Sequence, residues 1–172
     1  MADFLRMRRS DNMTTSTLPK ADRRDIQMLR MQQQVREIAK EEKKEVIGIE
    51  QIDDEEWVIV SKARTNDTFQ VMINQCSHPY QGTWDFVLEA EYQENHTLFI
   101  DDIKGEPCRG FGTICMNYLK EIAWKENCGI EGNIAKRDWG HVERLAHFYK
   151  KHSFEISLDV EQQNGRIQWF GH

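Results

Sequence analysis

Hydrophobic residues recur with two different periods along this chain, and the two periods separate helical from extended segments. Between about Arg24 and Lys44 there is no Gly or Pro, and apolar residues recur at steps of three or four: Met28, Met31, Val35 and Ile38. This spacing predicts an amphipathic helix that packs on one face of a sheet. A membrane-binding or partner-binding role for the same basic helix is the weaker interpretation.

The middle of the chain is rich in β-branched and aromatic residues, interrupted by the short polar stretches DDEE, TND, HPYQG and QEN. Such runs, bounded by turn-forming residues, are typical of strands. We expect strands at Val46–Ile52, Trp57–Lys62, Phe69–Asn74, Phe86–Tyr92 and Thr97–Ile103. With such short connections they are expected to form a largely antiparallel meander.

After Gly105 the pattern alternates between helical and extended segments. The expected helices are Gly112–Asn127 and Asp138–Lys151, and the expected strands are Ile130–Ala135, Phe154–Val160 and Arg166–Phe170. The dipeptide Asn164–Gly165 predicts a hairpin turn between the last two strands. The fold class is therefore α/β, of the α+β kind, with a mixed and mostly antiparallel central sheet flanked by helices.

Length and composition indicate one soluble globular domain. The chain has 172 residues, of which 39% are hydrophobic and 30% charged. We expect a single domain over residues 24–172 and an N-terminal segment 1–23 that is partly mobile, because Ser10–Pro19 is polar and ends in proline. No apolar run reaches the roughly 20 residues of a membrane helix, and no secretory signal is recognisable, so a cytoplasmic protein without membrane contact is expected.

The charges and the cysteines narrow the function classes further. Residues 1–44 carry a net charge of +4, and residues 45–172 carry −10. Such an acidic body disfavours nucleic acid as a partner and would attract a cationic substrate such as an amine. The cysteines form no CxxC pair, which predicts reduced, buried thiols at Cys76, Cys108, Cys115 and Cys128.

The most informative stretch is CRGFGTICMNYL, residues Cys108 to Leu119. Gly110 and Gly112 flank Phe111 between the predicted strand LFIDDI and the predicted helix. The free backbone N–H groups at the positive end of a helix suit a phosphate. By spacing alone a structural turn is equally consistent, since neither the P-loop pattern nor the dinucleotide fingerprint is present.

The order strand, RGFGT, helix, strand and a helix that ends in FYKKHSF resembles the GCN5-related N-acetyltransferases, known as the GNAT superfamily. The resemblance covers about residues 97–156. It implies acetyl-CoA as co-substrate, with the pyrophosphate held at the glycine turn. The residues that it assigns to cofactor binding are Ile103, Arg109, Gly110, Phe111, Gly112, Thr113, Ile114, Asn133 and Tyr149.

The resemblance also implies catalytic roles. Tyr149 lies on the inward face of its predicted helix, and in this family such a tyrosine protonates the departing CoA thiolate. A carboxylate would remove a proton from the amine. Asp101 and Asp102 on the strand before the turn and Glu131 on the next strand are the candidates, and Asp102 and Glu131 rank first. Adjacent strand residues face opposite ways, so only one of the two aspartates is expected to face the cleft.

The expected function is acetyl-CoA-dependent N-acetylation of a primary amine by direct attack on the thioester. The alternative is a non-catalytic acyl-CoA-binding or protein-interaction module, because Ile114, Val142 and Ser153 depart from the family pattern. No metal is expected, since the cluster of Cys76 and His78 with distant His96 lacks the paired spacing of a zinc site. A homodimer is compatible with the sequence, which does not identify the acceptor.

Overall fold

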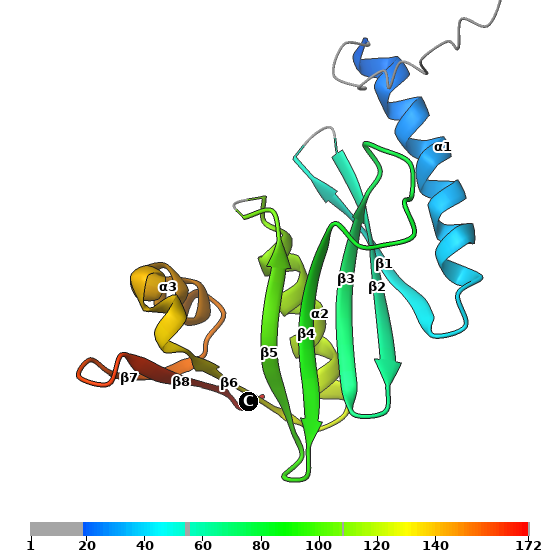
Figure 1. Cartoon of the computed structure of the whole chain (residues 1–172). Helices are drawn as coiled ribbons and strands as arrows, with labels where there is room; N and C mark the ends of the chain where they lie inside the picture. Colours follow the sequence, from blue (N-terminus) through cyan, green and yellow to red (C-terminus); the bar gives the residue numbers. More distant parts are fainter. Residues whose placement is uncertain (1–18, 54–55, 108, 172) are drawn as a thin grey trace, which may run out of the picture.

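The computed structural model describes residues 19–53, 56–107 and 109–171, and its elements follow the expected order (Figure 1). The helices are α1 (Lys20–Ala39), α2 (Phe111–Lys125), the 3-10 helix η2 (Lys136–His141) and α3 (Val142–Lys151). The strands are β1 (Lys44–Ile52), β2 (Glu56–Thr65), β3 (Thr68–Gln75), β4 (Phe86–Gln93), β5 (Thr97–Gly105), β6 (Gly129–Ile134), β7 (Glu155–Asp159) and β8 (Asn164–Trp169). Of the expected N-terminal segment, residues 1–18 lie outside the described part, and residues 20–23 belong to α1.

The strands form one sheet in the order β1-β2-β3-β4-β5-β6-β8-β7. Every neighbouring pair is antiparallel except β5 and β6, which are parallel. These two strands pair only over Thr97–Ile100 and Gly129–Gly132, and they separate beyond that point. The expected fold class is confirmed, and the structure adds that the sheet opens near the glycine turn.

The helices cover both faces of the sheet, as shown by alternate residues of one strand that pack against different helices. Val58 and Val60 of β2 belong to the core formed with α2 and α3, whereas Ile59 between them packs with Ile38 of α1. Figure 1 shows α2 behind the central strands and α1 beside β1 and β2. The larger core therefore lies under α2 and α3, on the face at which the glycine turn begins.

The first helix differs from its predicted position. It ends at Ala39 instead of Lys44, and Lys44 is already the first residue of β1. Met31, Val35 and Ile38 pack on the sheet as expected, but Met28 remains about half exposed. No described helix has the length and apolarity needed to cross a membrane.

Two buried glutamines of α1 explain why the apolar stripe is interrupted. The Oε1 atom of Gln27 accepts a hydrogen bond from the N–H of Trp57 at 3.1 Å. The Nε2 atom of Gln34 donates to the carbonyl oxygens of Gln75 at 3.0 Å and His78 at 2.7 Å. These hydrogen bonds satisfy backbone groups at the start of β2, at the end of β3 and in the β3–β4 loop. Polar side chains therefore take positions that hydrophobic periodicity alone would assign to apolar ones.

The predicted Asn164–Gly165 turn is wrong. Both residues belong to β8, where Asn164 pairs with Asp159 and Gly165 with Leu158. The chain reverses over residues 160–163 instead. Asp159 accepts a hydrogen bond from the N–H of Gln162 at 2.9 Å, and Gln163 takes the positive φ of 54°. The side-chain hydrogen bond of Asp159 therefore supports a longer turn than the Asn-Gly signal predicts.

Candidate functional site

The glycine turn connects β5 to α2 and leaves backbone donors exposed at the start of the helix. Gly110 precedes the first helical residue and has a φ of 77°, a left-handed conformation that favours glycine. Its carbonyl oxygen accepts the N–H of Ile114 at 3.1 Å. The N–H groups of Gly112 and Thr113 precede that bond and have no partner among the described residues, so they are available to an anion.

A cavity of about 530 Å³ lies beside this turn, between the start of α2 and α3. This is within the usual size range of small-molecule sites. Its walls are mostly apolar, and its polar side chains are those of Glu106, Thr113 and Arg144. The lining residues are Phe86, Ile103, Gly105, Glu106, Pro107, Gly110, Phe111, Gly112, Thr113, Arg144, Leu145 and Phe148.

Arg144 is the cation of this cavity, and the sequence analysis did not select it. It lies on α3, facing the turn from the other side, and its guanidinium makes no ion pair with any described residue. The signal that could have found it is its position on the helix face that also carries Leu145 and Phe148, which line the same cavity. An unpaired guanidinium opposite free backbone N–H groups suits a phosphate.

Arg109, the cation predicted for the same task, is differently placed. Its guanidinium forms an ion pair with Glu56, the first residue of β2, and its Cζ lies 5.6 Å from the centre of the Phe111 ring. It is not among the residues that line the cavity. The structure therefore brings Gly110, Phe111, Gly112 and Thr113 to the cavity wall and leaves Arg109 outside it.

Thr113 is linked to the end of α3 through His152. The imidazole Nε2 lies 3.4 Å from the Thr113 hydroxyl, and only 5% of His152 is exposed. Burial lowers the pKa of His152, and the nearby charges of Lys120 and Lys151 lower it further. The imidazole is therefore neutral at pH 7 and can join the α3 end to the turn without adding a charge.

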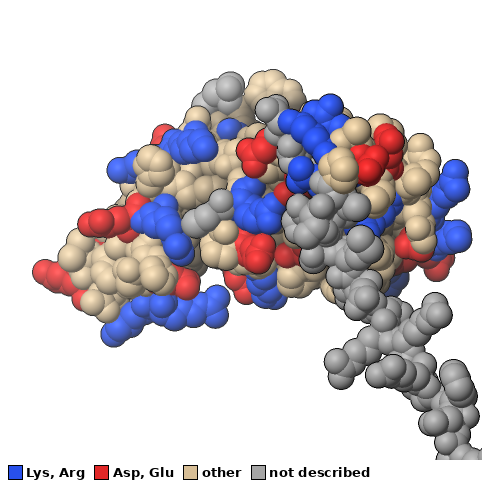
Figure 2. Space-filling model, turned by 90° about the horizontal axis from the view of Figure 1, so that it is seen from above, with Lys and Arg blue, Asp and Glu red and all other residues tan. Residues whose placement is uncertain are grey.

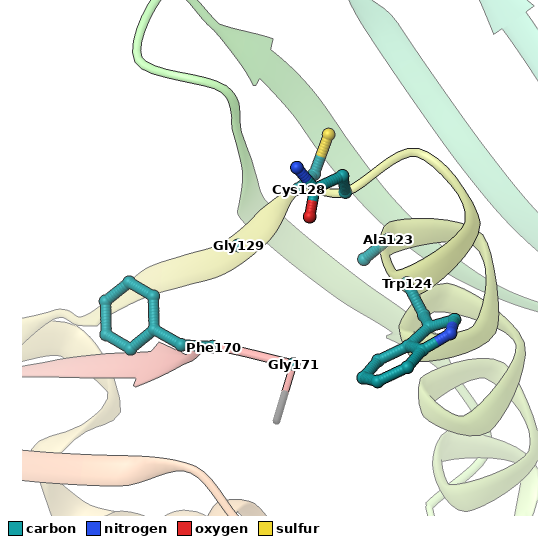
Figure 3. A pocket seen from close by; sticks show the side chains of 7 residues that line it. Ala123, Trp124, Cys128, Gly129, Phe170 and Gly171 are labelled. Atoms are coloured by element: carbon teal, nitrogen blue, oxygen red, sulfur yellow. The ribbon is translucent and has the colours of Figure 1, made fainter.

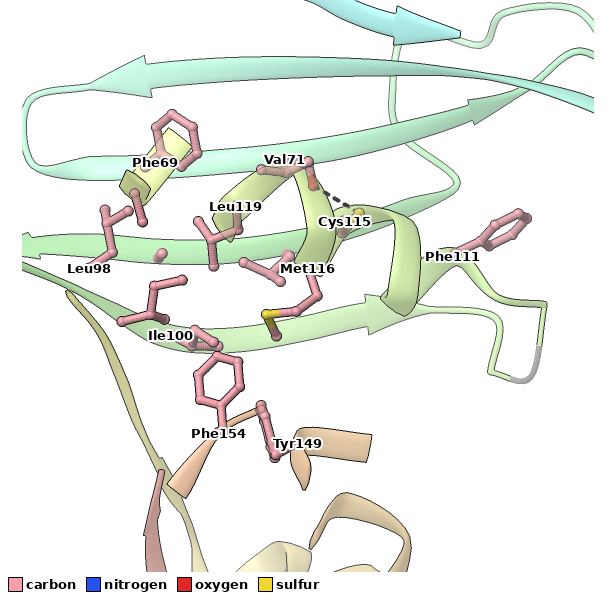
Figure 4. Packing of buried hydrophobic residues seen from close by; sticks show 14 of the residues in the cluster. Phe69, Val71, Leu98, Ile100, Phe111, Cys115, Met116, Leu119, Tyr149 and Phe154 are labelled. Atoms are coloured by element: carbon pink, nitrogen blue, oxygen red, sulfur yellow. Dashed lines mark hydrogen bonds between the residues drawn. The ribbon is translucent and has the colours of Figure 1, made fainter. Parts of the chain in front are cut away.

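Tyr149 is buried in the core between α3 and the sheet, as predicted for an inward-facing residue. It is 7% exposed, and its ring packs edge-on against Phe148 and Phe154 at 5.3 and 5.4 Å between centroids. Figure 4 shows it beside Phe154, in the cluster that includes Met116 and Ile100. Its hydroxyl makes no hydrogen bond to a described residue. Burial raises the pKa of Tyr149 to about 12, with smaller contributions from Asp138 and Asp102.

The candidate carboxylates lie around a bulge in β5. Glu89 of β4 pairs with Asp102, and the next residue, Ala90, pairs with Ile100. Asp101 is therefore the extra residue of the bulge and has no paired residue on β4. The expectation that the two aspartates must face opposite sides rests on regular alternation, which the bulge removes. Partial burial raises the pKa of the Asp101 carboxyl, and repulsion from Glu91, Glu89 and Asp102 raises it further.

The two carboxylates ranked first have different surroundings. Asp102 accepts the N–H of Ile103 at 2.9 Å and lies 3.7 Å from the ammonium of Lys104. Glu131 on β6 accepts hydrogen bonds from Arg166 at 3.1 Å and from Gln168 at 3.0 Å. Both donors, which belong to β8, bind the Oε1 atom of Glu131, whereas the contacts of Asp102 come from its own strand.

The remaining predicted residues lie on both sides of the opening in the sheet. Ile103, on β5, is half-buried and lines the cavity. Asn133, on β6, is exposed and is in register with Arg166 of β8. Ile114 packs against the core at the start of α2, where its N–H is already bonded within the helix.

The described cysteines are buried thiols, which disfavours a role as nucleophiles. The three described ones, Cys76, Cys115 and Cys128, are free and buried, as predicted, and Cys108 lies outside the described residues. Burial raises the pKa of Cys76 and of Cys115 to about 12. In the parts of the chain that the structure describes, no group of three or more His, Cys, Asp or Glu side chains is arranged to hold a metal ion.

A second cavity, of about 250 Å³, lies at the opposite end of α2 (Figure 3). Trp124 and Phe170 stand on either side of it, and no charged side chain is among its lining residues. It therefore lacks the cation and the helix-start amides that the first cavity provides. Figure 2 views the molecule from the end at which the glycine turn lies, where basic and acidic side chains are interspersed.

These features define a class of protein: a mixed sheet that opens between two parallel strands beside a glycine turn at a helix start. This is the fold expected from the resemblance to the GNAT superfamily. The chain is 44% identical over 146 residues to the uncharacterized protein YocC of Bacillus subtilis (strain 168), which covers 84% of this chain and 87% of YocC. It therefore belongs to the same protein family as YocC.

Other comparisons are more distant. No model of a known protein family matches the sequence. One similar solved structure is a protein of Bacillus anthracis described as a streptothricin acetyltransferase, in complex with acetyl coenzyme A, with 13% identity, a TM-score of 0.45 and coverage of 76% of this chain and 83% of that one. Another is the aminoglycoside 6'-N-acetyltransferase of Enterococcus faecium, with 13% identity, a TM-score of 0.38 and coverage of 60% and 72%. At these values the likenesses carry no argument about activity.

Proposed function

We propose that this protein is an N-acetyltransferase that transfers the acetyl group of acetyl-CoA to a primary amine. The observation that carries the proposal is the composition of the cavity at the start of α2. The N–H groups of Gly112 and Thr113 and the guanidinium of Arg144, none of which has a partner among the described residues, suit a pyrophosphate. The apolar walls suit the thin pantetheine arm. One elongated anionic ligand would use all three features.

The opening in the sheet supports a route for the pantetheine arm. Beyond Ile100, the β5 backbone has no strand partner on the side of β6 among the described residues. An extended ligand with amide groups can add to such an edge in the manner of a strand. Ile103 and Asn133 stand on either side of this route, in agreement with the cofactor contacts implied by the resemblance.

The chemistry that we propose is direct attack. The carboxylate first takes a proton from the ammonium, and the neutral amine nitrogen then bonds to the thioester carbonyl carbon. The carbon–sulfur bond breaks, the nitrogen loses a second proton to solvent, and solvent returns one to the thiolate. We assign that carboxylate to Asp102. It lies on β5 directly before Ile103, which lines the cavity. Glu131 is the weaker candidate because Arg166 and Gln168 already hold it.

Tyr149 would act on the leaving thiolate. Its hydroxyl stays protonated throughout the neutral range because its pKa is raised to about 12. An ordinary thiol has a pKa of about 8.5, so complete proton transfer from Tyr149 to the thiolate would be uphill. We therefore propose that Tyr149 donates a hydrogen bond to the developing negative charge on sulfur and that solvent completes the protonation.

Calorimetric titration with acetyl-CoA tests the cofactor, and an assay of CoA thiol release against polyamines, aminoglycosides, amino acids and peptides tests turnover. Arg144→Gln should weaken acetyl-CoA binding about ten-fold, the loss expected for a charge-assisted hydrogen bond. Arg137→Gln, which removes an exposed arginine of η2, is the matched control and should bind normally. Absence of binding by the wild type would sink the proposal, and binding without release for any amine would leave a non-catalytic acyl-CoA binder.

A further inference from the structure

The ion pair between Arg109 and Glu56 joins two segments that are 53 residues apart, the start of β2 and the glycine turn. The Arg109 side chain is 39% exposed and that of Glu56 is 17% exposed, so the carboxylate is the more enclosed partner. The guanidinium also lies near the ring of Phe111. These contacts direct Arg109 toward β2.

The consequence is that one of the two arginines near the turn lines the cavity and the other does not. Arg144 lines the cavity without an ion-pair partner in the described structure, and Arg109 lies outside with its charge neutralised. A guanidinium that binds a carboxylate and one that binds a phosphate use the same planar donors. A phosphate at the turn and the Glu56 carboxylate are therefore alternative partners of Arg109.

We propose that Glu56 is an internal competitor for Arg109, an autoinhibitory contact that lowers the affinity of the glycine turn for the phosphates of its ligand. This inference rests on the proposed function, in which the ligand is acetyl-CoA. When the ligand binds, Arg109 exchanges the carboxylate of Glu56 for a phosphate oxygen, and no covalent bond changes. Glu56 touches neither the cavity nor the reacting atoms, so it acts only through Arg109.

Glu56→Gln tests the proposal, because it removes the carboxylate charge and keeps the shape of the side chain. An exposed or half-exposed ion pair is worth about 0.2–1 kcal/mol, so acetyl-CoA should bind more tightly to this variant, by a factor between about 1.4 and five. The freed guanidinium should also make binding depend more steeply on salt. Titration calorimetry at two salt concentrations measures both effects.

Two further variants separate the proposed competition from simpler causes. Glu121→Gln breaks the exposed pair with Lys125 on α2 and removes the same charge away from the turn, so its affinity should not change. In an Arg109→Gln background, Glu56→Gln should bring no gain. If the gain persists in that background, Glu56 acts by repelling the anionic ligand directly. If Glu56→Gln alone binds acetyl-CoA equally well or more weakly than the wild type, the carboxylate either has no effect or helps to orient Arg109. Either result overturns the inference while wild-type binding upholds the proposed function, and absent wild-type binding overturns both.

Discussion

The ring of Phe148 lies against Gly112, so closely that a Cβ atom at position 112 would be 3.3 Å from Phe148 Cε2 and 3.4 Å from Cζ. This contact joins α3 to the first turn of α2 on the wall of the larger cavity. The glycine thus permits two things at once: close packing of an aromatic ring and access to a backbone N–H.

Gly112→Ala should weaken acetyl-CoA binding about ten-fold. The added methyl group would hold the phosphate oxygens away from the N–H groups whose hydrogen bonds they would accept. Stability should change little, since Phe148 must move by only a few tenths of an ångström and alanine favours the helix. Titration calorimetry and a melting curve measure the two effects. Gly140→Ala, where a Cβ meets no heavy atom within 4 Å, is the control and should bind normally. Equal affinities in the two variants would contradict the role of the turn.

Tyr149→Phe should lower kcat by about 10²-fold without lowering the melting temperature. The hydroxyl makes no hydrogen bond to a described residue, so its removal costs the fold little, whereas the developing thiolate would lose a donor. Steady-state kinetics of thiol release measure the loss. Tyr92→Phe is the control, because the Tyr92 hydroxyl donates to Glu126 at 2.6 Å, far from the cavity. This variant should lower the melting temperature and leave kcat unchanged. Unchanged kcat in Tyr149→Phe would remove the tyrosine from the mechanism.

Asp102→Asn should lower kcat/KM for the amine by about 10²–10⁴-fold and leave the dissociation constant of acetyl-CoA unchanged. Steady-state kinetics at varied amine concentration measure the loss. The comparison is Glu131→Gln, which should lower kcat/KM far less, since Arg166 and Gln168 both donate to Glu131 Oε1 and hold this side chain against β8. If Glu131→Gln loses more activity than Asp102→Asn, the two assignments are reversed.

The stability of the wild type should fall as the pH drops below about 6.5, in part because of His152. Folding lowers its pKa through burial, with Lys120 and Lys151 adding to the effect. The unfolded chain therefore binds the proton more tightly, so stability is full above the ordinary pKa and is lost as the pH falls through the lower folded value. His152→Gln should show a smaller drop in melting temperature between pH 7.5 and 5.5. His147→Gln, exposed on the same helix, is the control, and an equal drop in wild type and His152→Gln would contradict the prediction.

The fold was predictable from sequence to the extent that each element has a local signal. The meander and the helix after the glycine turn have strong periodicity, and both are confirmed. The end of α1 has no Gly or Pro to mark it in the sequence. The pairing of Lys44 with Ala63, a contact with a distant segment, decides where β1 begins. The Asn164–Gly165 error has the same origin, since the register with β7 outweighs the local turn signal.

The site was predictable only in its backbone. The turn from Gly110 to Thr113 has a local pattern, and it lines the cavity as expected. The partners of individual side chains come from distant segments: Glu56 holds Arg109, and Arg166 holds Glu131. The bulge at Asp101 follows from how β4 and β5 fit together, which strand periodicity does not encode.

The short parallel junction between β5 and β6 has a consequence for how the molecule unfolds. Among the described residues, the strand pairing between the meander β1–β5 and the C-terminal unit β6–β8 covers only Thr97–Ile100 and Gly129–Gly132, and it is the least extensive strand pairing of the sheet. The Gly129 N–H also donates to the His96 carbonyl oxygen, at 3.2 Å, beside this pairing. This seam is where we expect the lowest free energy of sub-global opening, with two cooperative foldons on its sides. A ligand that fills the opening would join the two foldons, so amide hydrogen exchange should slow in β6 and β8 as well as at the turn. The proposed binding site would then also be the place that sets the cooperativity of unfolding.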